Sequence, residues 1–209
     1  MIDPVPIVDP IIKGIIDYPS ESRAVELKPS IPWNDVDQQE QVQDIVKSIL
    51  GMSNIRDGGK IVLGVRQNSD KTFEVTGMTD EDLQTYDQEK IYQDARNFGK
   101  PEPRFEIRSM KYNGKFFIVF LVQEFLYSSI ICRKSGKNLG KEPLVKGALY
   151  IRTHKPETKR VDDETEMREI IDLAIDKELE RFSTRMQRVK IPKGEMDVQK
   201  FADEIEDVL

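Results

Sequence analysis

The chain has 209 residues, of which 38% are apolar and 33% are charged, and its formal net charge is −6. This length suits one folded domain with appendages, and the apolar fraction excludes a chain that is disordered throughout. The single cysteine, Cys132, excludes an internal disulfide, and the single histidine, His154, argues against a Cys/His zinc site.

Residues 1–20 are rich in proline and isoleucine, and we expect them to pack on the domain that follows, with a short helix at 11–16. Asp3 and Asp9 occur near the start without a basic residue, which excludes a signal peptide. No apolar run approaches the roughly 20 residues of a membrane helix. We therefore expect a cytoplasmic protein that does not contact a membrane.

The next segments predict a strand, a helix and a second strand. A strand is expected at 24–28, followed by a loop at Trp33. Apolar residues then recur at helical spacing and predict an amphipathic helix at 36–52. Gly58-Gly59 turns the chain into the strand 60–65, whose continuous apolar run is typical of a buried central strand.

The middle of the chain contains the clearest hairpin signal. A strand at 73–76 and a capped helix at about 79–98 come first. Asn113-Gly114 then separates the strands 104–111 and 115–122, and Asn-Gly favours a tight two-residue turn because both positions need positive φ. The apolar second strand should be central in the sheet.

The last third predicts a long basic loop at 123–147, with a strand at 129–133, then a strand at 148–152 and a long helix that begins after Asp162 or Asp163. The expected buried stripe of this helix is Met167, Ile170, Ile171, Ala174 and Ile175. We expect an α/β (α+β) fold with a single mixed sheet and helices packed on it. The domain should span 21–182, and 183–209 should form an acidic tail with a short helix.

Three segments, in this order, resemble the Schlafen AlbA-like domain. They are Glu21-Ser22-Arg23-Ala24-Val25-Glu26-Leu27-Lys28, the stretch from Ser53-Asn54 through Gly58-Gly59 to Gly64-Val65, and Gly147-Ala148-Leu149-Tyr150-Ile151-Arg152. The match departs from the family pattern at Leu27, where Phe is commoner, and in the longer gap at 55–57. The resemblance implies nucleic-acid binding in a regulatory or defence role.

Glu21, Glu26 and Lys28 are the candidate catalytic and metal-binding residues. Glu26 and Lys28 share a strand face, and Glu21 can fold back beside them. Two carboxylates and a lysine are the minimum for holding Mg²⁺ or Mn²⁺ against a phosphate. In nuclease relatives a third carboxylate follows the Gly-Val strand. Arg66-Gln67 stands at that place here, and Asp70 lies further round the turn. We therefore favour a structural ion pair, with no cofactor.

The basic residues are concentrated in one part of the chain. Residues 100–160 contain 14 Lys and Arg against 5 Asp and Glu. Such a segment can follow a phosphate backbone, with Tyr127 or Tyr150 stacking on bases or simply packing. The candidate nucleic-acid contacts are Arg133, Lys134, Lys137, Lys141, Arg152, Lys155, Lys159 and Arg160. His154 is expected beside the phosphate rather than as a general base.

Gly58-Gly59 does not form a phosphate loop for ATP, because the order here is helix, turn, strand rather than strand, loop, helix. Our leading interpretation combines the resemblance with the basic segment. It is a domain that binds DNA or RNA through the phosphate backbone, and a homodimer is one oligomeric state that we consider. Two alternatives stay open. One is a metal-dependent endoribonuclease that uses Glu21 and Glu26, and the other is a protein-interaction module that uses the acidic tail.

Overall fold

The computed structural model describes residues 5–6, 9–37, 39–139 and 143–188. The chain divides into a unit of residues 1–174 and a second unit of residues 175–209. The helices are α1 (Pro10–Asp17), α2 (Glu40–Ser53), α3 (Asp80–Gln84), α4 (Gln88–Phe98) and α5 (Glu164–Arg188). The strands are β1 (Val5–Pro6), β2 (Val25–Lys28), β3 (Gly59–Leu63), β4 (Val65–Gln67), β5 (Phe73–Val75), β6 (Gly99–Lys100), β7 (Phe105–Tyr112), β8 (Lys115–Val122), β9 (Ile131–Cys132), β10 (Tyr150–Arg152) and β11 (Thr158–Arg160).

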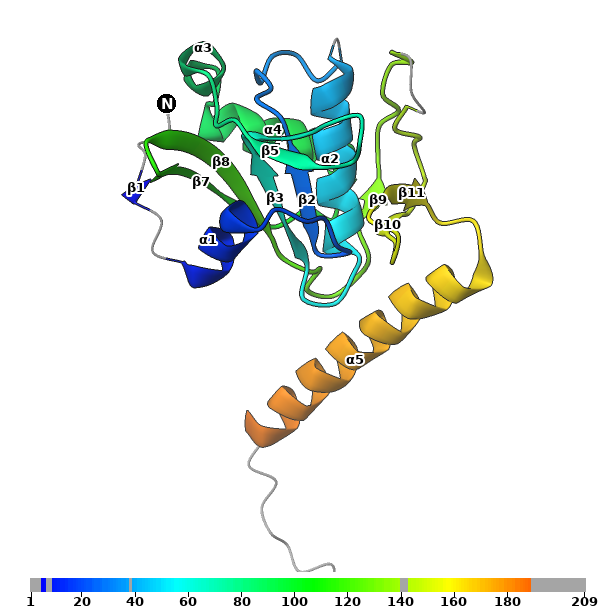
Figure 1. Cartoon of the computed structure of the whole chain (residues 1–209). Coiled ribbons are helices and arrows are strands. Elements are labelled where there is room, and N and C mark those ends of the chain that lie inside the picture. Colours follow the sequence, from blue (N-terminus) through cyan, green and yellow to red (C-terminus); the bar gives the residue numbers. More distant parts are fainter. Residues whose placement is uncertain (1–4, 7–8, 38, 140–142, 189–209) are drawn as a thin grey trace, which may run out of the picture. The chain divides into compact units, whose positions relative to one another are not determined.

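A five-stranded mixed sheet in the order β1-β7-β8-β3-β2 forms the centre of the first unit (Figure 1). β2 runs parallel to β3 and β1 runs parallel to β7, whereas β8 is antiparallel to both of its neighbours. Asn113 and Gly114 adopt the positive φ values of 48° and 76° that a tight hairpin turn requires. The predicted hairpin and the central position of its second strand are therefore confirmed.

The two faces of the sheet are covered by different helices. Ile118 and Phe120 of β8 pack in a large core with α2 and α4. Phe117 and Val119, which alternate with them, pack in a smaller core with Ile12 of α1. The mixed α+β fold is thus built on a sheet that is buried on both sides.

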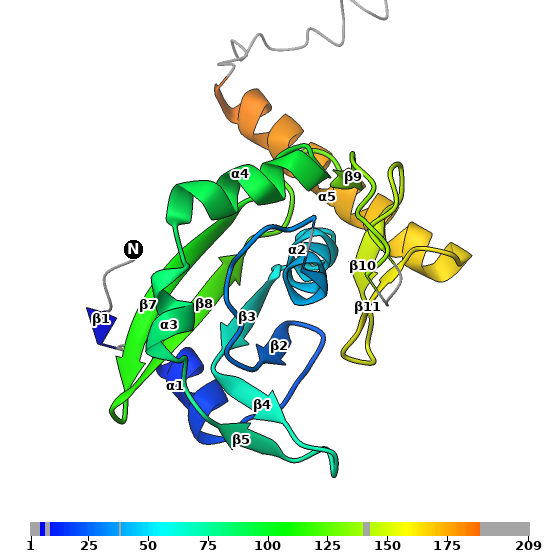
Figure 2. The same ribbon diagram turned by 90° about the horizontal axis from the view of Figure 1, so that it is seen from above.

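Three ribbons of two strands each supplement the sheet, so the single expected sheet accounts for only part of the strands. β4 pairs with β5, β6 with β9, and β10 with β11. The β10–β11 hairpin lies beside α2 (Figure 2). Gly51 of α2 permits this approach, because a Cβ there would lie 2.5 Å from Cγ2 of Thr158 and 3.3 Å from the carbonyl carbon of Ile151.

The sequence predicted one helix at 79–98, whereas the structure contains two. The helical conformation is interrupted around Tyr86, between α3 and α4. Tyr86 is fully buried and donates a hydrogen bond from its hydroxyl to the carbonyl oxygen of Ile31. Asp87 then caps α4 by accepting from the backbone N–H of Lys90. Packing of one aromatic side chain thus overrides a continuous helical pattern.

The prediction of which α5 residues are buried is wrong in part. Ile170 is buried as expected, and Leu173, which was not in the predicted set, is buried with it. Met167, Ile171 and Ile175 are 38%, 43% and 51% exposed. The helix has two apolar faces, and periodicity alone does not tell which of them meets the core. No helix in the described part of the chain is long and apolar enough to cross a membrane.

Candidate nucleic-acid interface

A cleft of about 570 Å³ opens where the edge strand β2 meets α2 and the β10–β11 hairpin. Its walls come from five parts of the chain, and charged side chains of both signs line it. The charged lining residues are Glu21, Glu26, Lys28, Asp44, Lys47, Arg66, Arg152 and Glu157. Two of the three sequence segments that predicted the fold, at 21–28 and 147–152, therefore meet at this cleft.

Glu26 lies at this cleft between two cations. Its Oε1 is 2.7 Å from Nζ of Lys28, and its Oε2 is 3.2 Å from Nη1 of Arg152. Glu26 and Arg152 are 3% and 2% exposed. Because a buried carboxylate is tolerated only when its charge is balanced, Lys28 and Arg152 together offset the charge of Glu26. The predicted shared face of Glu26 and Lys28 is confirmed.

Glu21 and Arg152 also form hydrogen bonds with backbone groups at the open edge of the sheet. β2 ends the sheet, so its outward backbone groups lack a strand partner. Oε1 of Glu21 accepts a hydrogen bond of 3.0 Å from the backbone N–H of Leu27. Nη2 of Arg152 donates to the carbonyl oxygen of Val25 at 3.3 Å. Both side chains thus hold the strand in place as well as lining the cleft.

Glu21 and Glu26, the two predicted metal ligands, are not arranged to hold a divalent cation. Glu26 already binds two cationic groups, and Glu21 accepts a backbone N–H. Arg66 and Gln67 line the same cleft at the place of the third acid, and Asp70 is not among the lining residues. A metal ion would have to displace Lys28 or Arg152 from Glu26 before it could bind.

Among the described residues, one group of three carboxylates has its ligand atoms within 4.8 Å of one another, and it lies outside the cleft. It consists of Asp162, Asp163 and Glu166. Nζ of Lys159 lies 2.9, 3.5 and 2.8 Å from these three carboxylates. Hydrogen bonds to Glu166 and Asp162 raise the pKa of Lys159. Its charge is therefore largely balanced within the protein.

The sequence of residues 21–162 matches the profile of the family described as Schlafen, AlbA_2. The chain belongs to this family. Among solved structures, a protein of Corynebacterium diphtheriae has 12% identity and a TM-score of 0.47, over 76% of this chain and 27% of that protein. The N-terminal domain of a RecG-related protein from Nitrosomonas europaea, named for an ATP-dependent DNA helicase, has 18% identity and a TM-score of 0.40, over 65% of this chain and 86% of that one. No curated protein matches the chain.

The β10–β11 hairpin of the AlbA_2 domain carries four of the predicted basic residues. Arg152 is buried against Glu26. Lys159 forms ion pairs with Asp162, Asp163 and Glu166. Lys155 and Arg160 are exposed, and neither forms an ion pair with any residue in the described part of the chain. Pro156, Glu157 and Thr158 form a wall of the cleft. Lys155 is therefore placed beside the cleft with its charge available.

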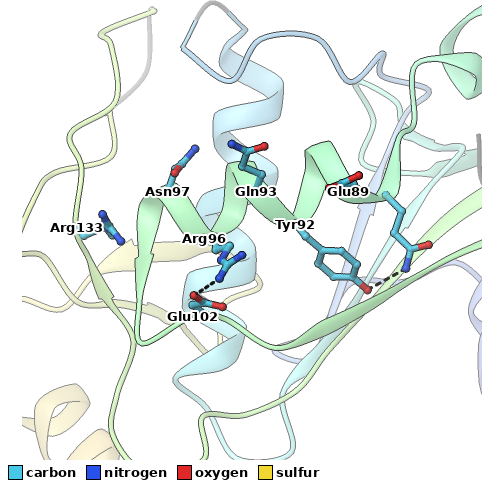
Figure 3. A pocket seen from close by; sticks show the side chains of 8 residues that line it. Glu89, Tyr92, Gln93, Arg96, Asn97, Glu102 and Arg133 are labelled. Carbon is cyan, nitrogen blue, oxygen red and sulfur yellow. Dashed lines mark hydrogen bonds and ion pairs between the residues drawn. The ribbon is translucent and has the colours of Figure 1, made fainter.

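The other predicted basic residues belong to a different surface. Arg133 lines a pocket of about 690 Å³ along α4, with Tyr92, Arg96 and Glu102 (Figure 3). Lys134 forms an ion pair of 2.6 Å with Asp37 and lies over the ring of Phe98. Lys137 is exposed, and Lys141 lies outside the described residues. The two pockets share no lining residue, so the basic residues of the AlbA_2 domain do not all meet at one groove.

Only one of the two tyrosines that were considered for stacking has an accessible ring. Tyr150 is fully buried, and its hydroxyl accepts a hydrogen bond from the backbone N–H of Val145, which excludes it as a stacking platform. Tyr127 is 60% exposed. His154 is exposed, with Nε2 3.5 Å from Nη1 of Arg23. Burial raises the pKa of the Cys132 thiol, so this cysteine is not an activated nucleophile.

Several residues of the cleft were missed by sequence reasoning. Asp44, Lys47 and Ser48 lie on α2, whose helical pattern signalled only its buried face. Asn54, which belongs to the second of the three resembling segments, does not line the cleft. It is 1% exposed, and its side-chain amide forms hydrogen bonds with the N–H and C=O of Ile130 and with the C=O of Tyr150.

Proposed function

We propose that the AlbA_2 domain binds nucleic acid through the phosphate backbone at the cleft between β2, α2 and the β10–β11 hairpin. The observation that carries the proposal is the meeting of Lys47 and Arg66 at one cleft, with the exposed Lys155 one position before the lining residue Pro156. Cations placed on separate elements can contact successive phosphates without reading bases. A regulatory or defence role is part of the same proposal.

The charges of the cleft are available to different degrees. Arg66 pairs with Glu74 at 2.5 Å, and both side chains are more than half exposed. Lys47 lies 4.0 Å from Asp44. Exposed ion pairs contribute at most about 1 kcal/mol, so a phosphate can replace Glu74 at little cost. Lys28 and Arg152, in contrast, are needed to balance Glu26.

The proposal is tested by fluorescence anisotropy with labelled single-stranded RNA, single-stranded DNA and duplexes at increasing salt. The Lys155→Gln/Arg160→Gln variant is compared with Lys90→Gln/Lys111→Gln, which removes the same charge from exposed positions on α4 and β7. The first variant should weaken binding to all sequences alike and reduce the slope of log K against log salt by about 1 to 2. A flat salt response, or an equal effect of both variants, contradicts the proposal.

Cleavage is a separate hypothesis, favoured by one observation, namely that Glu21 and Glu26 line the same cleft. We propose binding without cleavage, because Glu26 is held between Lys28 and Arg152. Purified protein is incubated with tRNA in Mg²⁺, Mn²⁺ or EDTA. Metal-dependent cleavage that disappears in Glu21→Gln, while anisotropy binding remains, would establish the nuclease instead.

The third candidate, a protein-interaction module, predicts no salt-dependent binding to any nucleic acid. A homodimer is compatible with the binding function, since two linked binding sites on one strand increase the overall affinity.

A further inference from the structure

The second unit of the chain carries an exposed apolar stripe on the C-terminal half of α5. Its four members are Ile175, Leu179, Phe182 and Met186, which are 51%, 60%, 59% and 41% exposed. Single apolar residues on a surface are ordinary, whereas four large ones in a row mark an interaction surface. This stripe lies apart from the nucleic-acid cleft in sequence and shares no residue with it.

The spacing of the stripe is that of a coiled coil. Its members are separated by four, three and four positions, which corresponds to alternating d and a positions of a heptad. Ile175 and Phe182 take the d positions, and Leu179 and Met186 take the a positions. The stripe extends over about 18 Å at a rise of 1.5 Å per residue. The chemistry that fits it is another helix with apolar residues at the same spacing.

The stripe is complementary to itself when the chain direction is reversed, because the spacing of four, three and four reads the same from both ends. In an antiparallel pair of two α5 helices, Ile175 of one copy faces Met186 of the other. Leu179 of one copy faces Phe182 of the other. Each apolar side chain is thus covered, as a two-fold symmetric interface requires.

The charges beside the stripe favour the same arrangement. Glu178 and Arg185 occupy successive g positions, directly before Leu179 and Met186. Facing g positions meet in an antiparallel pair, so Glu178 of each copy meets Arg185 of the other, twice per dimer. A parallel pair brings Glu178 next to Ser183 instead. Glu178 also lies 3.3 Å from Arg181 in its own helix, an exposed contact that exchanges easily.

We propose that the chain forms a homodimer through antiparallel pairing of α5, with Ile175, Leu179, Phe182 and Met186 as the seam. This inference goes beyond nucleic-acid binding and does not depend on it. The occupant is a second copy rather than an unrelated partner, because both the apolar spacing and the flanking charges are self-complementary.

The seam is tested by sedimentation equilibrium of the full chain over a wide range of concentrations, without nucleic acid. The wild type should approach twice the chain mass of 24.2 kDa. Leu179→Asp should raise the dissociation constant by about a hundredfold or more. Thr184→Asp introduces the same charge at an exposed position of α5 on the face opposite the seam and should leave the dimer intact. A wild type that stays monomeric, or a dimer unaffected by Leu179→Asp, overturns the proposal.

The orientation is tested by exchanging the two flanking charges. Glu178→Arg or Arg185→Glu alone places like charges together in an antiparallel pair and should weaken the dimer by about tenfold. The double variant Glu178→Arg/Arg185→Glu restores opposite charges and should recover most of the wild-type affinity. Absence of this recovery overturns the antiparallel pairing, because a cost to the helix itself would persist in the double variant.

Discussion

Nη1 of Arg152 lies 3.2 Å from Oε2 of Glu26, and both residues are almost completely buried. The pair joins the edge strand β2 to the β10–β11 hairpin. Arg152 and Val25, the neighbour of Glu26, are 127 positions apart in the sequence. Removing one member of a buried ion pair leaves the other charge uncompensated, so this contact should dominate the electrostatic contribution to stability at the cleft.

Glu26→Gln should lower the free energy of unfolding by about 3 kcal/mol or more, because it leaves Arg152 buried without a carboxylate. Urea denaturation at neutral pH measures the loss. Glu74→Gln is the matched control, since Glu74 pairs with Arg66 at the surface, and it should cost about 1 kcal/mol or less. Equal losses in the two variants would mean that burial of the Glu26 pair does not matter for stability.

Gly51→Ala tests how closely the β10–β11 hairpin packs against α2. Alanine is the better helix former by about 1 kcal/mol, but its Cβ would lie 2.5 Å from Cγ2 of Thr158 and 3.3 Å from backbone of Ile151. We expect a net loss of about 1 to 2 kcal/mol in the free energy of unfolding, measured by urea denaturation.

Two comparisons isolate the cause of that loss. Gly14→Ala in α1 meets nothing within 4 Å and should stabilise the domain by about 0.5 to 1 kcal/mol. Thr158→Ser removes Cγ2, so in combination with Gly51→Ala it should recover part of the stability. A Gly51→Ala variant as stable as Gly14→Ala would show that the hairpin moves away at no cost.

Local chemistry made much of the fold predictable. Asn113-Gly114 needs positive φ at both positions, which predicted the β7–β8 hairpin, and the apolar run of β8 predicted its central place. Alternation along β2 predicted that Glu26 and Lys28 share a face. Each of these predictions depends on residues that are close together in the sequence.

Contacts between distant segments were not predictable in this way. Nothing near Arg152 in the sequence indicates that it is buried against Glu26 rather than exposed for phosphate. Lys159 belongs to a basic segment, yet three carboxylates of the following turn and helix balance its charge. Met167, Ile171 and Ile175 of α5 were expected in the core but are exposed, because periodicity identifies apolar residues without identifying what they pack against. Charge counts therefore overstated the basic face.

Asp94 provides a prediction on pH. Burial raises the pKa of its carboxyl above 3.8, and the hydrogen bond of 2.9 Å from Nε1 of Trp33 opposes this effect. Because the folded state holds the proton more tightly than the unfolded state, stability from this group falls as pH rises from 3.8 to the raised pKa. Asp94→Asn should therefore stabilise the domain at pH 7, and the gain should diminish as the pH is lowered towards 3.8. Urea denaturation at a series of pH values measures it, and a gain independent of pH would point to another cause.

Lys155 and Lys159 are neighbours on one hairpin and should have separable roles. Lys155 is exposed and has no ion pair within the described residues, so Lys155→Gln should reduce the salt dependence of nucleic-acid binding by about one phosphate contact without changing the urea midpoint. Lys159 holds Asp162, Asp163 and Glu166 together, so Lys159→Gln should lower the urea midpoint while changing the salt dependence less. The opposite result is that Lys159→Gln weakens binding as much as Lys155→Gln does, at unchanged stability. That result would mean that Lys159 also contacts phosphate despite its ion pairs with the three carboxylates, so that the whole hairpin rather than its tip binds nucleic acid.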